Sequence, residues 1–468
     1  MSEADEPGGG RSGAGGTGRA EGAWFSRRLH FVGVGGAGMS GYARAAHALG
    51  AQVSGSDSAE GPYLDGLRAD GVLEPAIGHR AENVPAGDGV ELIYSSAVPA
   101  ENAERVAARE RGIRERPRAE LLAELTRLRR TIAVAGTHGK TTTSAMLVHA
   151  LRGAGLKPGW LVGGPVGGGL PNADWGEGEW LVVEADESDR SMLSLAAEVA
   201  LLTNVELDHH ATYASLAELR EAFREYLRAP SWAVVWDRPE LLALRDGPLV
   251  AYDVPAPRLH AGGSSFDWHG EAVELVVPGA HNALNAAAAL EAARLAGADT
   301  AAAVAALATF TGAGRRFQLL GRSAGGALLY DDYAHHPTEV AATLAAARTL
   351  AHRRLLAVFQ PHLYSRTASL AREFGAALAQ ADEVAVLDVY AARERSEEHP
   401  GVSGLLVAEA AADAAAGRPV YWLASFADAE RVLAGVLGEG DVCVLMGAGD
   451  IDGLGRALLA TSAGAVGG

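Results

Sequence analysis

The run Thr131-Ile-Ala-Val-Ala-Gly-Thr-His-Gly-Lys-Thr-Thr-Thr143 changes from apolar side chains to glycines, one lysine and a series of hydroxyls. Its apolar start predicts a short strand, and Gly136 and Gly139 lack the Cβ atoms that would keep backbone N–H groups away from phosphate oxygens. Lys140 adds a positive charge, and the helical periodicity of residues 144–151 turns the positive end of a helix dipole toward the same anion. The run therefore predicts a phosphate-binding loop.

This loop is shorter than the usual G-x-x-x-x-G-K-[ST] pattern, because Val134 occupies the place of the first glycine. A tight glycine turn before an ordinary helix is the alternative interpretation. The chain contains only two lysines, Lys140 and Lys157, and one of them lies at this position. That placement favours the phosphate loop, with Thr141 or Thr142 offering a hydroxyl to Mg²⁺.

Length and composition limit the classes of protein to consider. At about 150 residues per domain, 468 residues predict three domains. A net charge of −18 argues against a nucleic-acid or anionic-membrane surface, which needs concentrated lysine and arginine. The single Cys443 excludes an internal disulfide framework, and no apolar run approaches a membrane span of roughly 18 residues. We expect a cytoplasmic protein with a disordered Gly-rich tail over residues 1–24 and a flexible tail over residues 461–468.

The first structured segment has the pattern of a βαβ unit. We expect a strand over residues 29–34, a helix over 37–49 and a strand over 51–55. The glycine pattern at 33–38 lies in the first turn, and Asp57 follows the second strand. This layout predicts a site where a diphosphate approaches a helix N-terminus, without identifying the diphosphate.

The next segments continue this alternation. A strand over residues 90–94 runs into Ser95 and Ser96, which either bind a ligand at the end of the strand or satisfy their own turn. The Arg/Glu-rich residues 105–130 predict solvated helices that lead to the phosphate loop.

Two later strands of the same domain also end in polar residues. Glu184 ends an apolar strand, and its carboxylate is suited to Mg²⁺ or to capping a helix. His209 follows another strand, over residues 199–205. Because parallel strand ends meet at one edge of a sheet, the phosphate loop, Glu184 and His209 are predicted to converge. Farther along, Asn282 and Asn285 share one helical face, either as base-reading carboxamides or as an N-cap and a surface residue.

A third α/β pattern follows the glycine-punctuated residues 312–321. We expect strands over residues 328–332, 355–359 and 383–390 and helices over residues 337–350 and 367–379. Polar clusters again follow the strands: residues 331–336, 360–366 and 390–395.

Together these motifs resemble the ATP-dependent Mur ligases of bacterial cell-wall synthesis. The resemblance covers residues 29 to about 459 and rests on motifs in a fixed order: G-V-G-G-A-G-M at 33–39, S-G-S-D at 54–57, A-G-T-H-G-K-T-T-T at 135–143, E-A-D-E-S-D at 184–189, T-N-V-E-L-D-H at 203–209, H-N-A-L-N-A at 281–286, G-R-R-F-Q at 314–318, D-D-Y-A-H-H-P-T-E at 331–339 and P-H-L-Y-S-R-T at 361–367.

The resemblance implies an α/β protein of three domains. The implied domains are a Rossmann-like UDP-sugar-binding domain over residues 25–126, a central P-loop-type ATPase domain with a parallel sheet over residues 127–318, and a C-terminal Rossmann-like domain for the amino acid and ATP over residues 319–460. It further implies ATP and Mg²⁺ as cofactors, small-molecule substrates only, and a monomer or homodimer.

Within the family, the motifs are most similar to the branch that adds L-alanine to UDP-N-acetylmuramate. The implied reaction phosphorylates the lactyl carboxylate with ATP, and the amine of L-alanine then attacks the acyl phosphate. The implied catalytic residues are Lys140, Glu184, His209, His335 and Arg366. The implied ATP-binding residues are Gly136, Thr137, His138, Gly139, Lys140, Thr141, Thr142, His281, Asn282, Asn285, Arg316 and Asp332. The implied metal ligands are Thr141, Glu184 and His209.

The other two ligands have their own implied residues. The implied UDP-sugar-binding residues are Gly35, Gly36, Gly38, Met39, Ser56, Asp57, Ser95 and Ser96. The implied amino-acid-binding residues are Tyr333, His335, His362 and Arg366, with Arg366 pairing the amino-acid carboxylate.

Two departures from the family pattern concern the metals. His210 and Ala211 follow the metal histidine where the family usually has Met-Asp, so an acid near the second metal is missing. Sister ligases use a carbamylated lysine at the metals, and this chain has no lysine for that role beyond Lys157. Glu206 and Asp208 are the neighbouring acids that remain as candidates.

Three other functions compete with this interpretation. An NAD-dependent dehydrogenase would explain the glycines at 33–38 and Asp57, but not the phosphate loop. A related ligase that recycles murein peptides would join a tripeptide instead of alanine. A non-catalytic nucleotide-binding regulator would not need Lys140, Glu184 and His209 together.

Overall fold

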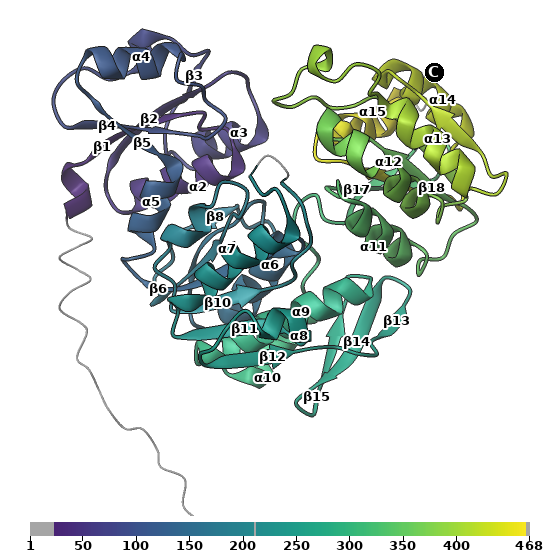
Figure 1. Ribbon diagram of the computed structural model, residues 1–468, viewed down its shortest axis with the longest axis horizontal. Coiled ribbons are helices and arrows are strands. Elements are labelled where there is room, and N and C mark those ends of the chain that lie inside the picture. Colours follow the sequence, from purple (N-terminus) through teal and green to yellow (C-terminus); the bar gives the residue numbers. More distant parts are fainter. Residues whose placement is uncertain (1–22, 210–211, 465–468) are drawn as a thin grey trace, which may run out of the picture.

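The alternating apolar strands and helices of this chain form three α/β domains, each around its own sheet (Figure 1). The computed structural model describes residues 23–209 and 212–464, so the predicted tail up to residue 22, the last residues 465–468 and the departure at His210-Ala211 lie outside the described residues. Among the described residues, no helix combines the length and the apolar character that a membrane crossing needs. The three-domain α/β prediction is confirmed.

The N-terminal domain has a parallel sheet in the order β3-β2-β1-β4-β5, which matches five strands of the Rossmann order 3-2-1-4-5-6. Its elements are η1 (Ala23–Ser26), β1 (Arg28–Val32), α2 (Ala37–Ala48), β2 (Gln52–Asp57), α3 (Pro62–Ala69), β3 (Ala76–Ile77), η2 (Ala81–Asn83), β4 (Val90–Tyr94), α4 (Ala103–Glu110), β5 (Arg114–Pro117) and α5 (Arg118–Leu125).

Two predictions for this domain need correction. Residues 105–130 are not only solvated helices, because they include strand β5 and α5 buries Leu121 and Leu125. The sequence pattern missed β5 because its side chains are mostly charged. In the structure Arg116 on β5 pairs with Glu91 on β4 at 2.9 Å. The predicted tail over residues 1–24 is also too long, because Trp24 lies in η1 and is 2% exposed.

The central domain has a sheet in the order β12-β11-β10-β6-β9-β7-β8, parallel except for the pair β7 and β8. A separate sheet, β13-β14-β15, is antiparallel. The elements are β6 (Arg130–Ala135), α6 (Lys140–Gly153), β7 (Gly159–Leu161), β8 (Ala173–Asp174), β9 (Trp180–Glu184), η3 (Ser191–Ser194), β10 (Val199–Leu202), α7 (Leu216–Arg228), β11 (Trp232–Trp236), α8 (Pro239–Leu242), β12 (Leu249–Tyr252), β13 (Arg258–His260), β14 (Gly263–Trp268), β15 (Glu271–Leu275), α9 (Ala280–Leu295) and α10 (Thr300–Leu307).

The C-terminal domain has a sheet in the order β16-β17-β21-β18-β19-β20, in which only β16 is antiparallel to its neighbour. Its elements are β16 (Gln318–Arg322), β17 (Leu328–Asp332), α11 (Pro337–Ala347), β18 (Leu355–Phe359), α12 (Tyr364–Leu378), β19 (Glu383–Val386), η4 (Ser396–Glu398), α13 (Gly404–Ala414), β20 (Val420–Trp422), α14 (Phe426–Val436), β21 (Val442–Met446) and α15 (Ile451–Gly464). The strand predicted over residues 383–390 ends at Val386, and α15 continues into the predicted tail.

The sheet orders place the polar strand ends together. Strands β10, β6 and β9 are consecutive neighbours and all parallel, so the loops that follow them leave the same edge of the central sheet. The C-terminal domain lies beside this part of the molecule, with α11 closest to α9 of the central domain (Figure 1). The candidate site is built at this edge.

Candidate active site

The phosphate loop connects β6 to α6, and close neighbours explain both of its glycines. Gly136 has φ +132°, and a Cβ there would collide with the hydroxyl of Thr203. Gly139, the N-cap of α6, has φ +81°, and a Cβ there would lie 2.7 Å from Asn285 Oδ1. The side chain of Asn204 accepts a hydrogen bond from the backbone N–H of residue 138 at 2.9 Å. The loop is therefore held open at a helix N-terminus, the geometry that binds phosphate.

Lys140 is folded back over this loop. Its Nζ donates to the carbonyl oxygens of Gly136 at 2.6 Å and Thr137 at 3.1 Å, and to Glu187 Oε1 at 2.9 Å. Burial opposes the charge, but the Glu187 carboxylate outweighs it and raises the pKa of Lys140. The ammonium is thus kept charged beside the loop, where a phosphate would meet it.

Glu187 is an acid that the sequence did not single out. It is 1% exposed, and its Oε1 lies 3.2 Å from His209 Nε2 as well as beside Lys140. Its Oε2 is buried and has no hydrogen-bond partner among the described residues. Glu187 belongs to the motif at 184–189, but only the turn after β9 determines which acid of that motif points at the loop.

Glu184, the predicted metal ligand, lies at the end of β9 near Thr141. Its Oε1 accepts a hydrogen bond from the N–H of Gly163 at 2.7 Å, and burial raises its pKa. The Thr141 hydroxyl interacts with Glu184 and accepts a hydrogen bond from Arg316 Nη2 at 3.4 Å. Two of the three predicted metal ligands are thus adjacent, whereas the third, His209, contacts Glu187.

The predicted adenine residues lie at the start of α9. Gly279 is the N-cap, so the alternative of Asn282 as an N-cap is wrong. Asn282 Nδ2 donates to the carbonyl of Pro278 at 2.8 Å, and Asn285 Nδ2 donates to Asn282 Oδ1 at 3.4 Å. Burial lowers the pKa of His281 to about 4. This face of α9 adjoins the phosphate loop, because Asn285 lies beside Gly139. Thr142, another predicted ATP-binding residue, is buried in the first turn of α6.

Asp332 organises the first loop of the C-terminal domain. Its carboxylate accepts hydrogen bonds from the N–H groups of Phe317 at 2.7 Å and Ala334 at 2.8 Å, and burial raises its pKa to about 6. The guanidinium of Arg316 lies over the ring of Tyr333 at 4.6 Å. The ATP-binding roles of Asp332 and Arg316 stay predictions, while their contacts place both at the start of this loop.

The residues predicted for the amino acid lie together. The ring of His335 is 5.4 Å from that of Tyr333 and 6.1 Å from that of His362. Burial lowers the pKa of His335 to about 4 and that of His362 to about 3, so both imidazoles are neutral near pH 7. Arg366 Nη1 lies 3.3 Å from His362 Nδ1.

Arg366 also crosses the junction between two domains. Its guanidinium binds both carboxylate oxygens of Asp208, at 2.8 and 3.0 Å, and the two side chains are 6% and 5% exposed. Burial opposes the Asp208 charge, but Arg366 outweighs it and holds the pKa of that carboxyl well below its usual range. The suggestion of Asp208 as a free metal acid is therefore not supported, because the carboxylate is already paired.

His138 of the phosphate loop makes a second link across the same junction. Its Nε2 lies 3.0 Å from Glu206 Oε2, and its Nδ1 lies 3.0 Å from Glu339 Oε1 on α11. Burial opposes a charged ring, but the two carboxylates outweigh it and raise the pKa of His138 to about 9. The Thr137 hydroxyl donates to the backbone carbonyl of Glu206 at 2.9 Å. His138 thus connects the loop to the C-terminal domain.

The predicted UDP-sugar residues surround the glycine turn before α2. The N–H of Gly35 donates to Asp57 Oδ2 at 2.7 Å, Gly36 is the N-cap of α2, and Met39 is buried. A Cβ on Gly38 would lie 3.4 Å from the guanidinium of Arg118. Ser95 and Ser96 end the neighbouring strand β4, with Ser96 exposed.

Ser56 needs a correction within this group. It is fully buried, and its hydroxyl donates to Glu104 Oε2 at 2.8 Å. His30 Nε2 and Asn83 Nδ2 contact the same carboxylate, at 2.8 and 2.7 Å. The side chain of Ser56 therefore belongs to an internal polar network and does not face the glycine turn.

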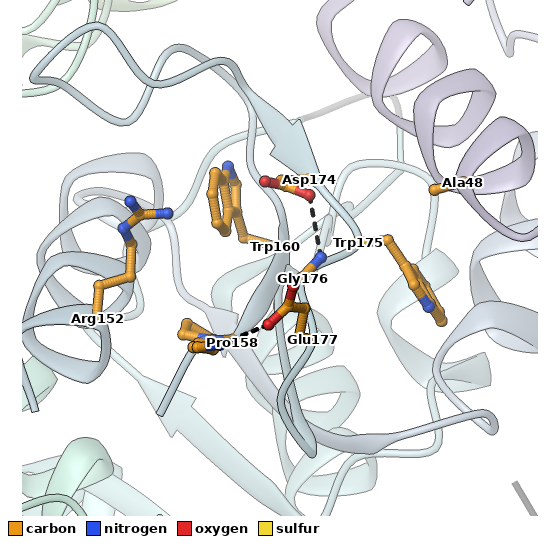
Figure 2. A pocket seen from close by; sticks show the side chains of 9 residues that line it. Ala48, Arg152, Pro158, Trp160, Asp174, Trp175, Gly176 and Glu177 are labelled. Carbon is orange, nitrogen blue, oxygen red and sulfur yellow. Dashed lines mark hydrogen bonds and ion pairs between the residues drawn. The ribbon is translucent and has the colours of Figure 1, made fainter. Parts of the chain in front are cut away.

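A pocket lined by the central domain and by Ala48 of α2 lies at the other end of α6 (Figure 2). Its lining residues are Ala48, Arg152, Lys157, Pro158, Trp160, Asp174, Trp175, Gly176 and Glu177. Arg152 is in the last turn of α6, whereas Lys140 begins that helix. None of the predicted site residues lines this pocket, so it is separate from the phosphate loop.

Family models match the three domains in order. The Mur ligase family catalytic domain matches residues 28–130, the Mur ligase middle domain residues 134–293, and the Mur ligase glutamate ligase domain residues 315–449. The UDP-N-acetylmuramate–L-alanine ligase of Saccharopolyspora erythraea is 43% identical over 92% of this chain and 93% of its own length. The protein of the same name from Rubrobacter xylanophilus is 43% identical over 92% of this chain and 99% of its own length.

Solved structures agree with the sequence relatives. The UDP-N-acetylmuramate–alanine ligase of Thermotoga maritima matches with a TM-score of 0.80 at 28% identity, covering 94% of this chain and 99% of that one. A murein peptide ligase from Psychrobacter arcticus shares the fold, with a TM-score of 0.71 at 24% identity over 93% of this chain and 99% of that one. The order of the motifs, the three sheets and these relatives lead to one conclusion: the chain belongs to the Mur ligase family.

Proposed function

We propose that this chain is an ATP-dependent ligase that joins L-alanine to the lactyl carboxylate of UDP-N-acetylmuramate, a step in making peptidoglycan precursors. One observation carries the proposal. The adjacent ends of β6, β9 and β10 bring Lys140 of the phosphate loop and His209 each within hydrogen-bond distance of Glu187. The relatives named for this reaction align with the chain over 92% of its length.

The reaction needs two anions to approach each other. A carboxylate oxygen of the UDP-sugar attacks the γ-phosphorus of ATP, ADP leaves, and an acyl phosphate forms. The neutral amine of L-alanine then attacks the acyl carbon, a proton leaves the nitrogen, and inorganic phosphate departs. Lys140 supplies a fixed positive charge, and the N-terminus of α6 supplies backbone N–H groups, so both anions are stabilised where they meet.

The residues present also fit Mg²⁺, which prefers oxygen ligands. Thr141 and Glu184 offer a hydroxyl and a carboxylate. His209 lies next to Glu187, whose Oε2 is buried with no hydrogen-bond partner in the part of the chain that the structure describes. We assign Glu187 as the acid that compensates for the missing Met-Asp pair after His209. Bound Mg²⁺ would neutralise phosphate charge during transfer. We expect Glu187→Gln to raise the Mg²⁺ concentration needed for half-maximal phosphate release; an unchanged requirement would remove Glu187 from the metal site.

The amino-acid side of the site is assigned to the C-terminal domain. In this structure Asp208 binds the guanidinium of Arg366 through both oxygens, the geometry that an amino-acid carboxylate would also use. We infer that the alanine carboxylate exchanges with Asp208 on Arg366. The rings of His335 and His362 beside Arg366 are neutral. Arg366 is therefore the positive charge that would bind the alanine carboxylate.

The decisive experiment measures phosphate release from ATP and Mg²⁺ with UDP-N-acetylmuramate. L-Alanine, L-serine, glycine and a murein tripeptide are supplied in turn. Release that depends on L-alanine supports the proposal, and release only with the tripeptide would favour the recycling ligase. Release with none of these amines would reject a ligase of this class.

The two lysines of the chain provide a matched test of the phosphate loop. We expect Lys140→Ala to lower the rate of phosphate release by at least about 10²-fold, because a charge beside the transferred phosphate is lost. UDP-N-acetylmuramate should bind the variant with unchanged affinity, since its predicted site lies in another domain. Lys157→Ala should keep full activity, because Lys157 is exposed and pairs with Glu177. Loss of UDP-sugar binding in Lys140→Ala would contradict the division of roles between the domains.

A further inference from the structure

Three metal-binding side chains meet at the junction between the central and C-terminal domains. Glu206 Oε2 lies 3.0 Å from His138 Nε2 and 3.9 Å from His336 Nδ1, and the ligand atoms of all three residues lie within 4.8 Å of one another. We propose that His138, Glu206 and His336 form a site for a transition-metal ion of the Zn²⁺ class, which fastens the C-terminal domain to the phosphate loop.

The donor set determines the class of metal. Two imidazole nitrogens and one carboxylate are a common ligand set of zinc sites with an open fourth position. Mg²⁺ prefers oxygen ligands, so the chemistry of this cluster differs from that of Thr141 and Glu184. Metal–ligand distances of about 2.0–2.2 Å place ligand atoms roughly 3–3.5 Å apart. The separation between His138 and Glu206 already matches this spacing. His336 Nδ1 now accepts the Thr338 N–H at 3.4 Å, and it would exchange this cap for the ion to complete the site.

A second set of contacts orients the proposed ligands. The Nδ1 of His138 lies 3.0 Å from Glu339 Oε1, which leaves Nε2 free to face the metal. The hydroxyl of Thr338 donates to Glu206 Oε1 at 2.8 Å, which leaves Oε2 toward the two rings. A carboxylate behind a ligating histidine is the usual outer contact of zinc sites. The cluster therefore has the support that a built metal site requires.

The surroundings allow a metal to enter. The side chain of Glu206 is 42% exposed, whereas those of His138 and His336 are 12% and 5% exposed. A divalent cation bound between His138 and Glu206 would balance the negative charge of Glu206 and of Glu339, which lies on the other side of the His138 ring.

The ligands come from two domains, so a bound metal would restrict their relative movement. His138 and Glu206 belong to loops of the central domain, while His336 is the N-cap of α11 in the C-terminal domain. A bound ion would join the two domains through His138, two residues from Lys140. Zn²⁺ is therefore expected to hold the domains in the arrangement seen here.

Co²⁺ is the probe, because its visible absorption reports directly on its ligands. It is titrated alone into the full chain, without nucleotide or substrate, so the result does not depend on the proposed ligase activity. We expect one equivalent to bind, and an excess of Mg²⁺ should leave its absorption unchanged. His336→Asn and Glu206→Gln should each weaken Co²⁺ binding by at least about 10-fold. Asn at position 336 can still cap the N-terminus of α11, and Gln at position 206 keeps an oxygen that accepts the hydrogen bond from Thr338. Both variants are therefore expected to fold.

The control is His260→Asn, because His260 lies 3.8 Å from Glu274 but belongs to no three-ligand cluster among the described residues. It should bind Co²⁺ as the unmodified chain does. Thermal unfolding without metal checks that each variant folds, and Zn²⁺ should raise the unfolding temperature of the unmodified chain but not that of His336→Asn. Absence of Co²⁺ binding, its displacement by Mg²⁺, or equal affinity in folded His336→Asn and Glu206→Gln would overturn the proposal.

Discussion

The two domain junctions of this molecule are stabilised by different interactions. One cluster of buried apolar side chains runs from the N-terminal domain into the central domain, including Leu121 on one side and Leu161 and Ala173 on the other. Each remaining apolar cluster of the described residues stays on one side of the second junction. There the contacts that link the central and C-terminal domains include Asp208 with Arg366 and the group around His138.

The difference indicates which domain is free to move. Separating an apolar junction exposes surface to water at a cost proportional to its area. Separating charged pairs lets water solvate both partners, so the net cost is smaller. Salt bridges are also present at the first junction, where Arg118 donates to Asp186 at 2.7 Å and Asp189 at 2.8 Å, but there they accompany the apolar core. We therefore expect the C-terminal domain to open and close while the other two domains move together.

The strongest test removes the charge of Asp208. In Asp208→Asn the guanidinium of Arg366 keeps its charge without a carboxylate, and breaking a buried pair in this way costs about 3–5 kcal/mol. The domain can relieve that cost by opening, so we expect a larger radius of gyration in small-angle X-ray scattering. Calorimetry should also show a separate, earlier unfolding transition for the C-terminal domain.

Asp189→Asn is the matched control at the other junction. Arg118 keeps Asp186 as a partner in this variant, and the apolar core is unchanged. Its radius of gyration should equal that of the unmodified chain. If Asp189→Asn opened the molecule more than Asp208→Asn, the comparison between the two junctions would be wrong.

A change of pH should loosen one junction and spare the other. The folded pKa of His138 is raised to about 9 from 6.5, so its contribution to the closed state is complete below pH 6.5 and is lost as the pH rises through 9. At the first junction, burial raises the pKa of Asp186, but the charge of Arg118 has the larger effect and lowers this pKa to about 2. The ion pair between Asp186 and Arg118 is therefore lost only in acid. Between pH 6.5 and 9.5 the free energy that favours the closed C-terminal junction should fall by about 2 kcal/mol. This figure is reduced to allow for the solvent exposure of Glu206.

Spin labels can follow each junction separately. The single native cysteine, Cys443, is buried, so engineered surface cysteines can be labelled selectively. Distances between the central and C-terminal domains should lengthen or broaden as the pH rises, while those between the other two domains stay constant. Glu339→Gln should reduce this response, because the Glu339 carboxylate is the main charge that raises the pKa of His138. A response of equal size at both junctions would contradict the assignment.

The sequence predicted the sheets and the strand ends because both depend on local pattern. Strands at residues 90–94, 328–332 and 355–359 have the predicted bounds, since short apolar runs between turn residues determine them. Strand β5 was missed because three of its four residues are charged, and the pairing of Arg116 with Glu91 forms only across the sheet. Local pattern cannot reveal a partner that is distant in sequence.

The same limit explains what was missed at the site. Glu187 was one acid among several, and only the turn after β9 directs it to Lys140. Glu339 lies 201 residues from His138, so their contact depends on how the C-terminal domain packs. Ser56 was assigned to a ligand from the S-G-S-D motif at 54–57, whereas its partner Glu104 lies 48 residues away and only the packing brings the two together. Sequence reasoning located the site, while tertiary packing determined which acids complete it.

The smallest expected effect comes from the apolar junction itself. Gly41 on α2 faces the central domain, and a Cβ there would lie 3.1 Å from Ala173 Cβ and 3.7 Å from the side chain of Leu161. We expect Gly41→Leu to cost about 1–2 kcal/mol, because overpacking is partly offset by the loss of a helix-interior glycine. The unfolding temperature shared by the N-terminal and central domains should fall, with the C-terminal transition unchanged.

Gly435 on α14 provides the control, because a Cβ there would meet nothing within 4 Å. Gly435→Leu gains helix propensity without a clash, so it should leave the shared transition of the other two domains unaffected. If Gly41→Leu left that transition unchanged as well, the packing between α2 and β8 would not be what joins the first two domains. The Arg118 ion pairs would then have to hold them, and a high salt concentration should separate both junctions alike, because ions screen exposed charges but not apolar contacts.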